Sequence, residues 1–143
     1  MSETIRVLLI DDERMFAESL SKVLKRRGIT VQSAQDGRTG VELFAQAEFD
    51  VVVLDMRMPG MDGLATFKAI RDRDSATPVI FLSGHMDINQ VSQALKDGCT
   101  EILLKPCPVD QLVSCIEDAA ERKHCVIGVV GKSQGGCSQS GAP

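Results

Sequence analysis

The sequence has little aromatic character: five of its 143 residues are Phe, and it contains neither Trp nor Tyr. Apolar residues nevertheless make up 43% of the chain and charged residues 25%, which are ordinary proportions for a soluble globular protein. A chain of this length is typical of one domain that buries roughly 68% of the surface exposed in its unfolded state. We therefore expect a single domain with an aliphatic core.

Three further absences narrow the class of protein. The five Cys are odd in number and include no Cys-x-x-Cys pair, which argues against a disulfide framework or a zinc site. The net charge is −4 and Lys25–Arg27 is the only basic cluster, which argues against direct nucleic-acid binding. No apolar run approaches the ~20 residues that span a bilayer, and acidic residues interrupt the N-terminal run too early for a signal peptide. We therefore expect a cytoplasmic protein without membrane contact.

Short apolar runs alternate with amphipathic stretches along the chain. The runs that predict strands are Ile5–Ile10, Ile29–Ala34, Asp50–Leu54, Pro78–Ser83 and Glu101–Lys105. The helical stripes that follow them are Phe16–Leu24, Val41–Ala45, Leu64–Arg71, Ile88–Leu95 and Val109–Ala120. Repeated strand–helix alternation predicts parallel strands with right-handed crossovers and helices on both faces of the sheet. We therefore expect an α/β protein of the flavodoxin-like (βα)5 type, a three-layer sandwich with sheet order 2-1-3-4-5.

Local signals place some boundaries of these elements. Gly28 follows a cationic last helical turn and is the expected C′ residue of the first helix. Asp36 is a candidate N-cap of the second helix. After His124 the composition becomes rich in Gly and Ser, so we expect one domain at residues 1–124 and a flexible tail or truncated linker at 125–143. The run that opens this tail is also compatible with a short extra strand.

Polar residues stand at the ends of four predicted strands. Asp11 and Asp12 end the first, Asp55 the third, Ser83 the fourth and Lys105 the fifth. Taken singly, Asp12 and Ser83 could be helix caps and Lys105 a surface charge. In a parallel sheet, however, these strand ends share one edge, where ligands bind. Three carboxylates so close together repel unless a cation is present, and a few hard oxygen ligands completed by water suit Mg²⁺.

Four segments that carry these residues resemble the signatures of bacterial two-component response regulator receiver domains. They are LLIDDE, VVVLDMRMPGMDG, PVIFLSGH and EILLKP, and they occur in the family's order and spacing across about residues 4 to 122. The resemblance implies that Asp55 is the phosphoacceptor. It also implies that Asp12 binds Mg²⁺ directly, that Asp11 acts through water, and that the backbone carbonyl of Arg57 is a further ligand. Mn²⁺ is an alternative ion.

The resemblance implies further roles at the other strand ends. Ser83 corresponds to the hydroxyl residue that hydrogen-bonds the phosphoryl group, and Lys105 to the lysine that pairs with it. Pro106 corresponds to a proline whose preceding peptide bond is usually cis in the family. Ile102 departs from the family, because a Tyr or Phe that acts as a rotating switch usually stands there.

Two other positions have a tuning role in similar proteins. Arg57 and His85 lie two residues beyond Asp55 and Ser83, where side chains influence phosphoryl hydrolysis in the family. Simple exposure to solvent is an equally good explanation for both of them.

The resemblance also implies partners. The phosphoryl donor would be a phosphohistidine on a sensor histidine kinase or a phosphotransfer protein, and Asp55 would act as a carboxylate nucleophile. The face formed by the fourth helix, fifth strand and fifth helix would bind a partner or a second copy. The chain would therefore work as a signalling phosphoacceptor in a phosphorelay, not as an enzyme with turnover on other substrates.

Two alternatives remain open from the sequence. An aspartate-nucleophile phosphatase of the haloacid-dehalogenase type would usually place a second acid two residues after the nucleophile, where this chain has Arg57. A degenerate receiver would act as a phosphorylation-independent binding module. The retention of working chemistry at all five strand-end positions argues against that reading.

Overall fold

The structure is a computed structural model that describes residues 4–56, 63–84, 88–96, 98 and 101–128. Five strands alternate with five helices in this part of the chain. The strands are β1 (Arg6–Ile10), β2 (Thr30–Ala34), β3 (Val51–Asp55), β4 (Val79–Ser83) and β5 (Glu101–Leu104). The helices are α1 (Arg14–Arg26), α2 (Gly37–Gln46), α3 (Gly63–Arg73), α4 (Ile88–Lys96) and α5 (Val109–Gly128).

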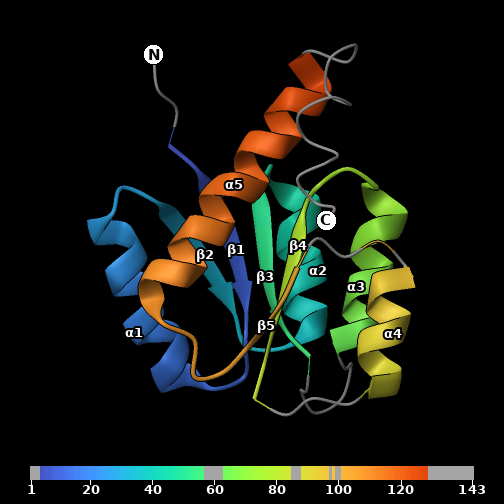
Figure 1. Ribbon diagram of the computed structural model, residues 1–143, viewed down its shortest axis with the longest axis horizontal. Helices are drawn as coiled ribbons and strands as arrows, with labels where there is room; N and C mark the ends of the chain where they lie inside the picture. Colours follow the sequence, from blue (N-terminus) through green and yellow to red (C-terminus); the bar gives the residue numbers. More distant parts are fainter. Residues whose placement is uncertain (1–3, 57–62, 85–87, 97, 99–100, 129–143) are drawn as a thin grey trace.

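The strands form one parallel sheet in the order β2-β1-β3-β4-β5, which confirms the predicted topology. Figure 1 shows α1 and α5 on one face of the sheet and α2, α3 and α4 on the other. The fold is therefore the expected flavodoxin-like three-layer sandwich, with β3 at the centre of the sheet.

The alternation of side chains along each strand divides the core in two. On β1, Val7 and Leu9 face the layer of α1 and α5, whereas Leu8 and Ile10 face α2 and α3. The first cluster is entirely aliphatic among its buried members. The buried Phe side chains all lie in the second cluster, as Phe44, Phe49, Phe67 and Phe81. The expected aliphatic core is thus confirmed on one face and supplemented by four rings on the other.

Two helix boundaries follow the local signals in the sequence. Gly28 has a φ of 85°, and its N–H donates to the carbonyl of Lys25 while the N–H of Ile29 donates to that of Leu24. These two bonds form a Schellman motif and confirm Gly28 as the C′ residue of α1. Asp36 caps α2 by accepting a hydrogen bond of 2.8 Å from the backbone N–H of Thr39. That bond, more than any other contact, lowers the pKa of the Asp36 carboxyl.

Some boundaries differ from the sequence-based prediction. Asp55 is the last paired residue of β3, because its backbone lies in register with Leu82 of β4. Helix α5 continues to Gly128, so residues 125–128 are helical and do not form the extra strand considered from the sequence. The proposed end of the domain at residue 124 stays a prediction. Within the described part of the chain, no helix combines the length and apolarity needed to cross a membrane.

Arg71 joins three segments on the α3 side of the molecule. Its guanidinium donates to the carbonyl of Thr77 at 2.6 Å and to that of Gly98, just after α4, at 3.1 Å. It also lies 5.1 Å from the centroid of the Phe67 ring, which packs edge-to-face on Phe81 of β4. The C-terminal ends of α3 and α4 are therefore linked by a single cation.

Gly63 brings the start of α3 directly against the end of β3. Its N–H donates to the carbonyl of Met56, and a Cβ at this position would lie 2.6 Å from the Met56 Cα and 2.7 Å from the carbonyl oxygen of Asp55. These are backbone atoms that cannot move aside as a flexible side chain can. The approach therefore requires glycine, and it fixes the backbone around Asp55.

Alanine substitutions at two glycines should separate close packing from backbone conformation. Gly63→Ala should lower the free energy of unfolding by about 3 kcal/mol, because the added methyl overlaps backbone. Gly28→Ala should lower it by about 1 kcal/mol, because its surroundings are open and only the left-handed conformation is strained. Urea denaturation measures both values. Equal losses in the two variants would contradict the close approach at Gly63.

Candidate functional site

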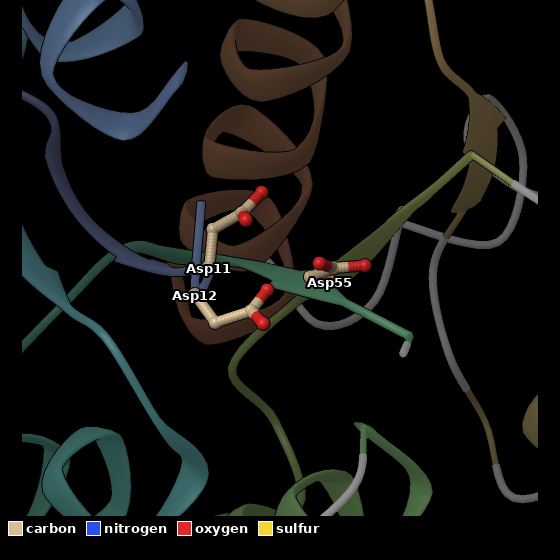
Figure 2. A group of neighbouring side chains, drawn as sticks. All are labelled: Asp11, Asp12 and Asp55. Atoms are coloured by element: carbon tan, nitrogen blue, oxygen red, sulfur yellow. The ribbon is translucent and has the colours of Figure 1, made fainter. Parts of the chain in front are cut away.

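The structure brings the predicted strand-end residues to one edge of the sheet. Asp11 directly follows β1, Asp55 and Ser83 end β3 and β4, and Lys105 directly follows β5. Because these four strands are neighbours in the sheet, their carboxyl ends lie side by side. Asp11, Asp12 and Asp55 each offer an oxygen within 4.8 Å of the others, and Figure 2 shows the three side chains gathered there. The juxtaposition predicted from the sequence is therefore confirmed.

The three carboxylates differ in burial. Asp11 is 1% and Asp55 6% exposed, whereas Asp12 faces solvent. Buried carboxylates require hydrogen bonds or a cation to offset lost hydration. Both oxygens of Asp11 have partners: Oδ1 accepts from the backbone N–H of Glu13 at 2.9 Å, and Oδ2 accepts from Lys105 Nζ at 3.0 Å. Asp11 is thus rigidly oriented by its own chain and by Lys105.

Lys105 is the cationic centre of this edge. Its Nζ lies 2.9 Å from Glu13 Oε1 and 3.0 Å from Asp11 Oδ2, but 3.9 Å from Asp55 Oδ2. Burial acts to lower the pKa of the Lys105 ammonium, but hydrogen bonds to Glu13 and Asp11 and the charges of Asp11 and Asp55 raise it overall. Lys105 therefore stays charged at neutral pH, within reach of three carboxylates.

The backbone ties Lys105 to its neighbouring strand. Its N–H donates to the carbonyl of Ser83 at 2.7 Å, so the ends of β4 and β5 are held together beside Asp55. The Lys105–Pro106 peptide bond is cis, which is the form that the resemblance implies. Ser83 itself is 1% exposed. A group attached to Asp55 would therefore meet two strand ends that are already coupled.

The donor set at this edge fits a divalent cation. Asp12 gathers with Asp11 and Asp55, and Lys105 lies near Asp11, Glu13 and Asp55, so among these described residues the negative charge is in excess. Oxygen ligands that come from few side chains and leave room for water are those that Mg²⁺ prefers. Asp12 is the carboxylate most open to solvent of the three that gather here, and it can reach an ion that keeps several waters.

Three other residues with predicted roles are Arg57, His85 and Ile102. Arg57 and His85 lie outside the described residues. Ile102 is half-buried and packs against the second core cluster, the one that contains Phe81. Two residues of α1's beginning, Glu13 and Phe16, contact Lys105 although the sequence analysis gave them no role at the site. Their spacing is a usable signal, because residues three apart near a helix start lie on the same side.

Comparisons with known proteins agree with this geometry. The family model described as "Response regulator receiver domain" matches residues 7–117. AtoC from Escherichia coli K12 is 33% identical over 121 residues, which cover 85% of this chain and 26% of AtoC. DctD from Rhizobium meliloti is 35% identical over 127 residues, which cover 89% of this chain and 28% of DctD. The chain thus spans about a quarter of the length of these curated relatives.

Solved structures show the same fold. A receiver domain protein from Clostridium thermocellum superposes with a TM-score of 0.81 at 31% identity, covering 85% of this chain and 98% of that one. An α/β sandwich with an acidic edge is the class that fold and site define. The chain belongs to the response regulator receiver domain family. Domains of this family are the phosphoacceptors of two-component signalling.

Asp12 provides a test of the cation site. Asp12→Ala should weaken Mg²⁺ binding at least about tenfold, because it removes a charged oxygen ligand from a small donor set. Isothermal titration calorimetry measures the affinity. The matched control is Asp110→Ala, which removes an exposed carboxylate that pairs with Arg27 and does not belong to the acidic cluster. Normal affinity in Asp12→Ala, or an equal loss in the control, would overturn the assignment.

Proposed function

We propose that this chain accepts a phosphoryl group on Asp55 with Mg²⁺ and changes conformation in response. The observation that carries the proposal is the position of the Asp55 carboxylate. It stands at the end of the central strand, in reach of the Asp11 and Asp12 oxygens and 3.9 Å from Lys105 Nζ. A carboxylate so placed is a nucleophile surrounded by the charges that phosphoryl transfer needs.

The chemistry requires one bond to form and one to break. An oxygen of Asp55 attacks phosphorus, the phosphorus–nitrogen bond of a phosphohistidine breaks, and the imidazole of the donor leaves with the electron pair. Asp11, Asp12, Asp55 and the Arg57 backbone carbonyl would hold Mg²⁺, which when bound neutralises charge on the phosphoryl oxygens. Lys105 supplies a second positive charge near Asp55. Mn²⁺ suits the same oxygen ligands.

The acyl phosphate would be recognised by the coupled ends of β4 and β5. The product brings dianionic charge and new acceptor oxygens to the edge. Ser83 can donate its hydroxyl to one of them and Lys105 its ammonium to another. Because the Lys105 N–H already binds the Ser83 carbonyl, movement of either strand end is shared with the other. The phosphoryl group thereby biases a two-state element, as in other modification switches.

Ile102 limits how the conformational change can be transmitted to the protein surface. An aliphatic side chain packed against the second core cluster cannot make the swing of an aromatic ring between buried and exposed positions. Exposed apolar side chains nearby offer another output. Leu95 of α4 is 58% exposed and Leu104 of β5 is 48% exposed. They support the face of α4, β5 and α5 as the surface for a partner or a second copy.

The wider assignment follows from this chemistry. The donor would be a sensor histidine kinase or a phosphotransfer protein, and the setting the cytoplasm. Arg57 and His85 remain candidates for tuning hydrolysis of the phosphoryl group. We propose no turnover on separate substrates and no direct binding of nucleic acid by this chain. The degenerate binding module is disfavoured, because Asp11, Asp55, Ser83 and Lys105 are assembled at one edge.

Phosphorylation by a small donor tests the proposal directly. Incubation with acetyl phosphate and Mg²⁺ should add one phosphoryl group to the wild-type chain and none to Asp55→Asn, because the amide is a poor nucleophile. Intact-protein mass spectrometry measures the adduct, and Asp110→Asn is the control that should remain reactive. Absence of any adduct would support the binding module instead. Turnover of an added phosphomonoester would support the phosphatase.

Lys105 should be required for the response more than for metal binding. Lys105→Ala should keep Mg²⁺ affinity within about threefold, since the carboxylate ligands remain. It should lose most of the backbone amide shifts that phosphorylation causes in α4 and β5, since the ammonium no longer links the phosphoryl group to β5. Heteronuclear NMR measures both, with Lys25→Ala in the last turn of α1 as control. Shifts of wild-type size in Lys105→Ala would contradict this role.

A further inference from the structure

Lys105 is held by the beginning of α1 more closely than by Asp55. Glu13 Oε1 lies 2.9 Å from the Lys105 Nζ, a full ångström nearer than the Asp55 oxygen at 3.9 Å. The Phe16 ring contributes a second contact, with the ammonium 4.4 Å from its centroid. A cation over an aromatic face at this distance is attracted to the ring. Two side chains of one helical turn therefore draw the ammonium toward α1.

The local structure of α1 leaves Glu13 free to make this contact. Glu13 occupies the N-cap position but makes no side-chain hydrogen bond to the helix. Its backbone N–H donates to Asp11 Oδ1, which fixes its Cα relative to the acidic edge. Phe16 is half-buried and packs against the first core cluster, so the ring is supported from behind. The fold thus holds both Glu13 and Phe16 in place for their contacts with Lys105.

We infer that Glu13 and Phe16 are positioning residues that hold the Lys105 ammonium on the α1 side of the site and compete for it with phosphorylated Asp55. The inference rests on the proposed function, in which Lys105 pairs with the phosphoryl group. Lys105 Nζ already donates to Glu13 and Asp11 and lies 3.9 Å from Asp55 Oδ2, so a shift toward a phosphoryl group on Asp55 would weaken its contact with Glu13. The strength of the α1 contact therefore sets how readily the phosphorylated state forms.

Charge and reach can be separated at Glu13. Glu13→Gln removes the charge and keeps the length, whereas Glu13→Asp keeps the charge but is one methylene too short for the 2.9 Å contact. Asp is also a preferred N-cap residue, so this variant should fold at least as well as the wild type. Both substitutions release Lys105 if the contact matters. Only Glu13→Gln changes the net charge at the acidic edge of the sheet.

The first measurement is the affinity for beryllofluoride with Mg²⁺, as an analogue of the phosphoryl group on Asp55. Both Glu13 variants should bind it about threefold to fivefold more tightly than the wild type, the range expected when one exposed ion pair no longer competes. Arg14→Ala is the control, because Arg14 is exposed on the same turn and contacts Gln35. Tighter binding by Glu13→Gln alone would indicate a pure charge effect and overturn the inference, as would wild-type affinity in both.

The second measurement needs no phosphoryl analogue. The ε-methylene protons of Lys105 adjoin an ammonium over the Phe16 ring, so they should show an upfield ring-current shift in the NMR spectrum. The shift should disappear in Phe16→Leu, persist in Phe16→Tyr, and shrink in Glu13→Gln, in which the ammonium is released. A full shift in Glu13→Gln would overturn the inference. Failure of the wild type to bind beryllofluoride would instead count against the proposed function. The outcome of the NMR test does not depend on beryllofluoride binding.

Discussion

The central constraint on this structure is the repulsion among carboxylates at the end of the sheet. Asp11 and Asp55 are almost fully buried within reach of Asp12, and the Lys105 ammonium lies beside Asp11 and Asp55. Such a group of like charges stabilises nothing by itself, and it persists because the surrounding fold determines it. The Schellman motif, the Asp36 cap and the two cores supply the stability that allows an unfavourable edge. The carboxylates are therefore held together by the fold and by their contacts with Lys105, not by any attraction among themselves.

The parallel sheet brings these charged residues together and links them to several elements of the fold. The charged residues are far apart in sequence, since Lys105 follows Asp11 by 94 positions. They meet because every crossover returns the chain to the start of the next parallel strand. All the strands therefore end at the same edge of the sheet. Asp11, Asp55, Ser83 and Lys105 thus stand at the ends of four different strands, and a change of charge at Asp55 acts on several elements together. The hydrogen bond between the Lys105 N–H and the Ser83 carbonyl makes this coupling direct for β4 and β5.

The sequence predicted the sheet order and the shared strand edge, because apolar runs and their polar ends follow simple periodic rules. It also predicted Gly28 and Asp36 at helix ends, where the signal is local. It did not predict that Glu13 and Phe16 would contact Lys105. Their spacing places both on one side of the helix start, but the contact itself also depends on the direction in which the Lys105 side chain extends, which the local pattern does not encode. The end of α5 was also missed, because composition changed before the helix ended.

Arg71 restrains the C-terminal side of α4. The hydrogen bond from its guanidinium to the Gly98 carbonyl fixes the C-terminal end of the helix to α3. Pulling Gly98 away would break a bond from a charged donor, at a cost of about 1.5–3 kcal/mol. Rotation of α4 about that end leaves the bond intact. A displacement of α4 that keeps this bond is therefore one in which the end of the helix nearest Gly98 stays beside Arg71, so the bond limits how α4 can respond to a shift of β4.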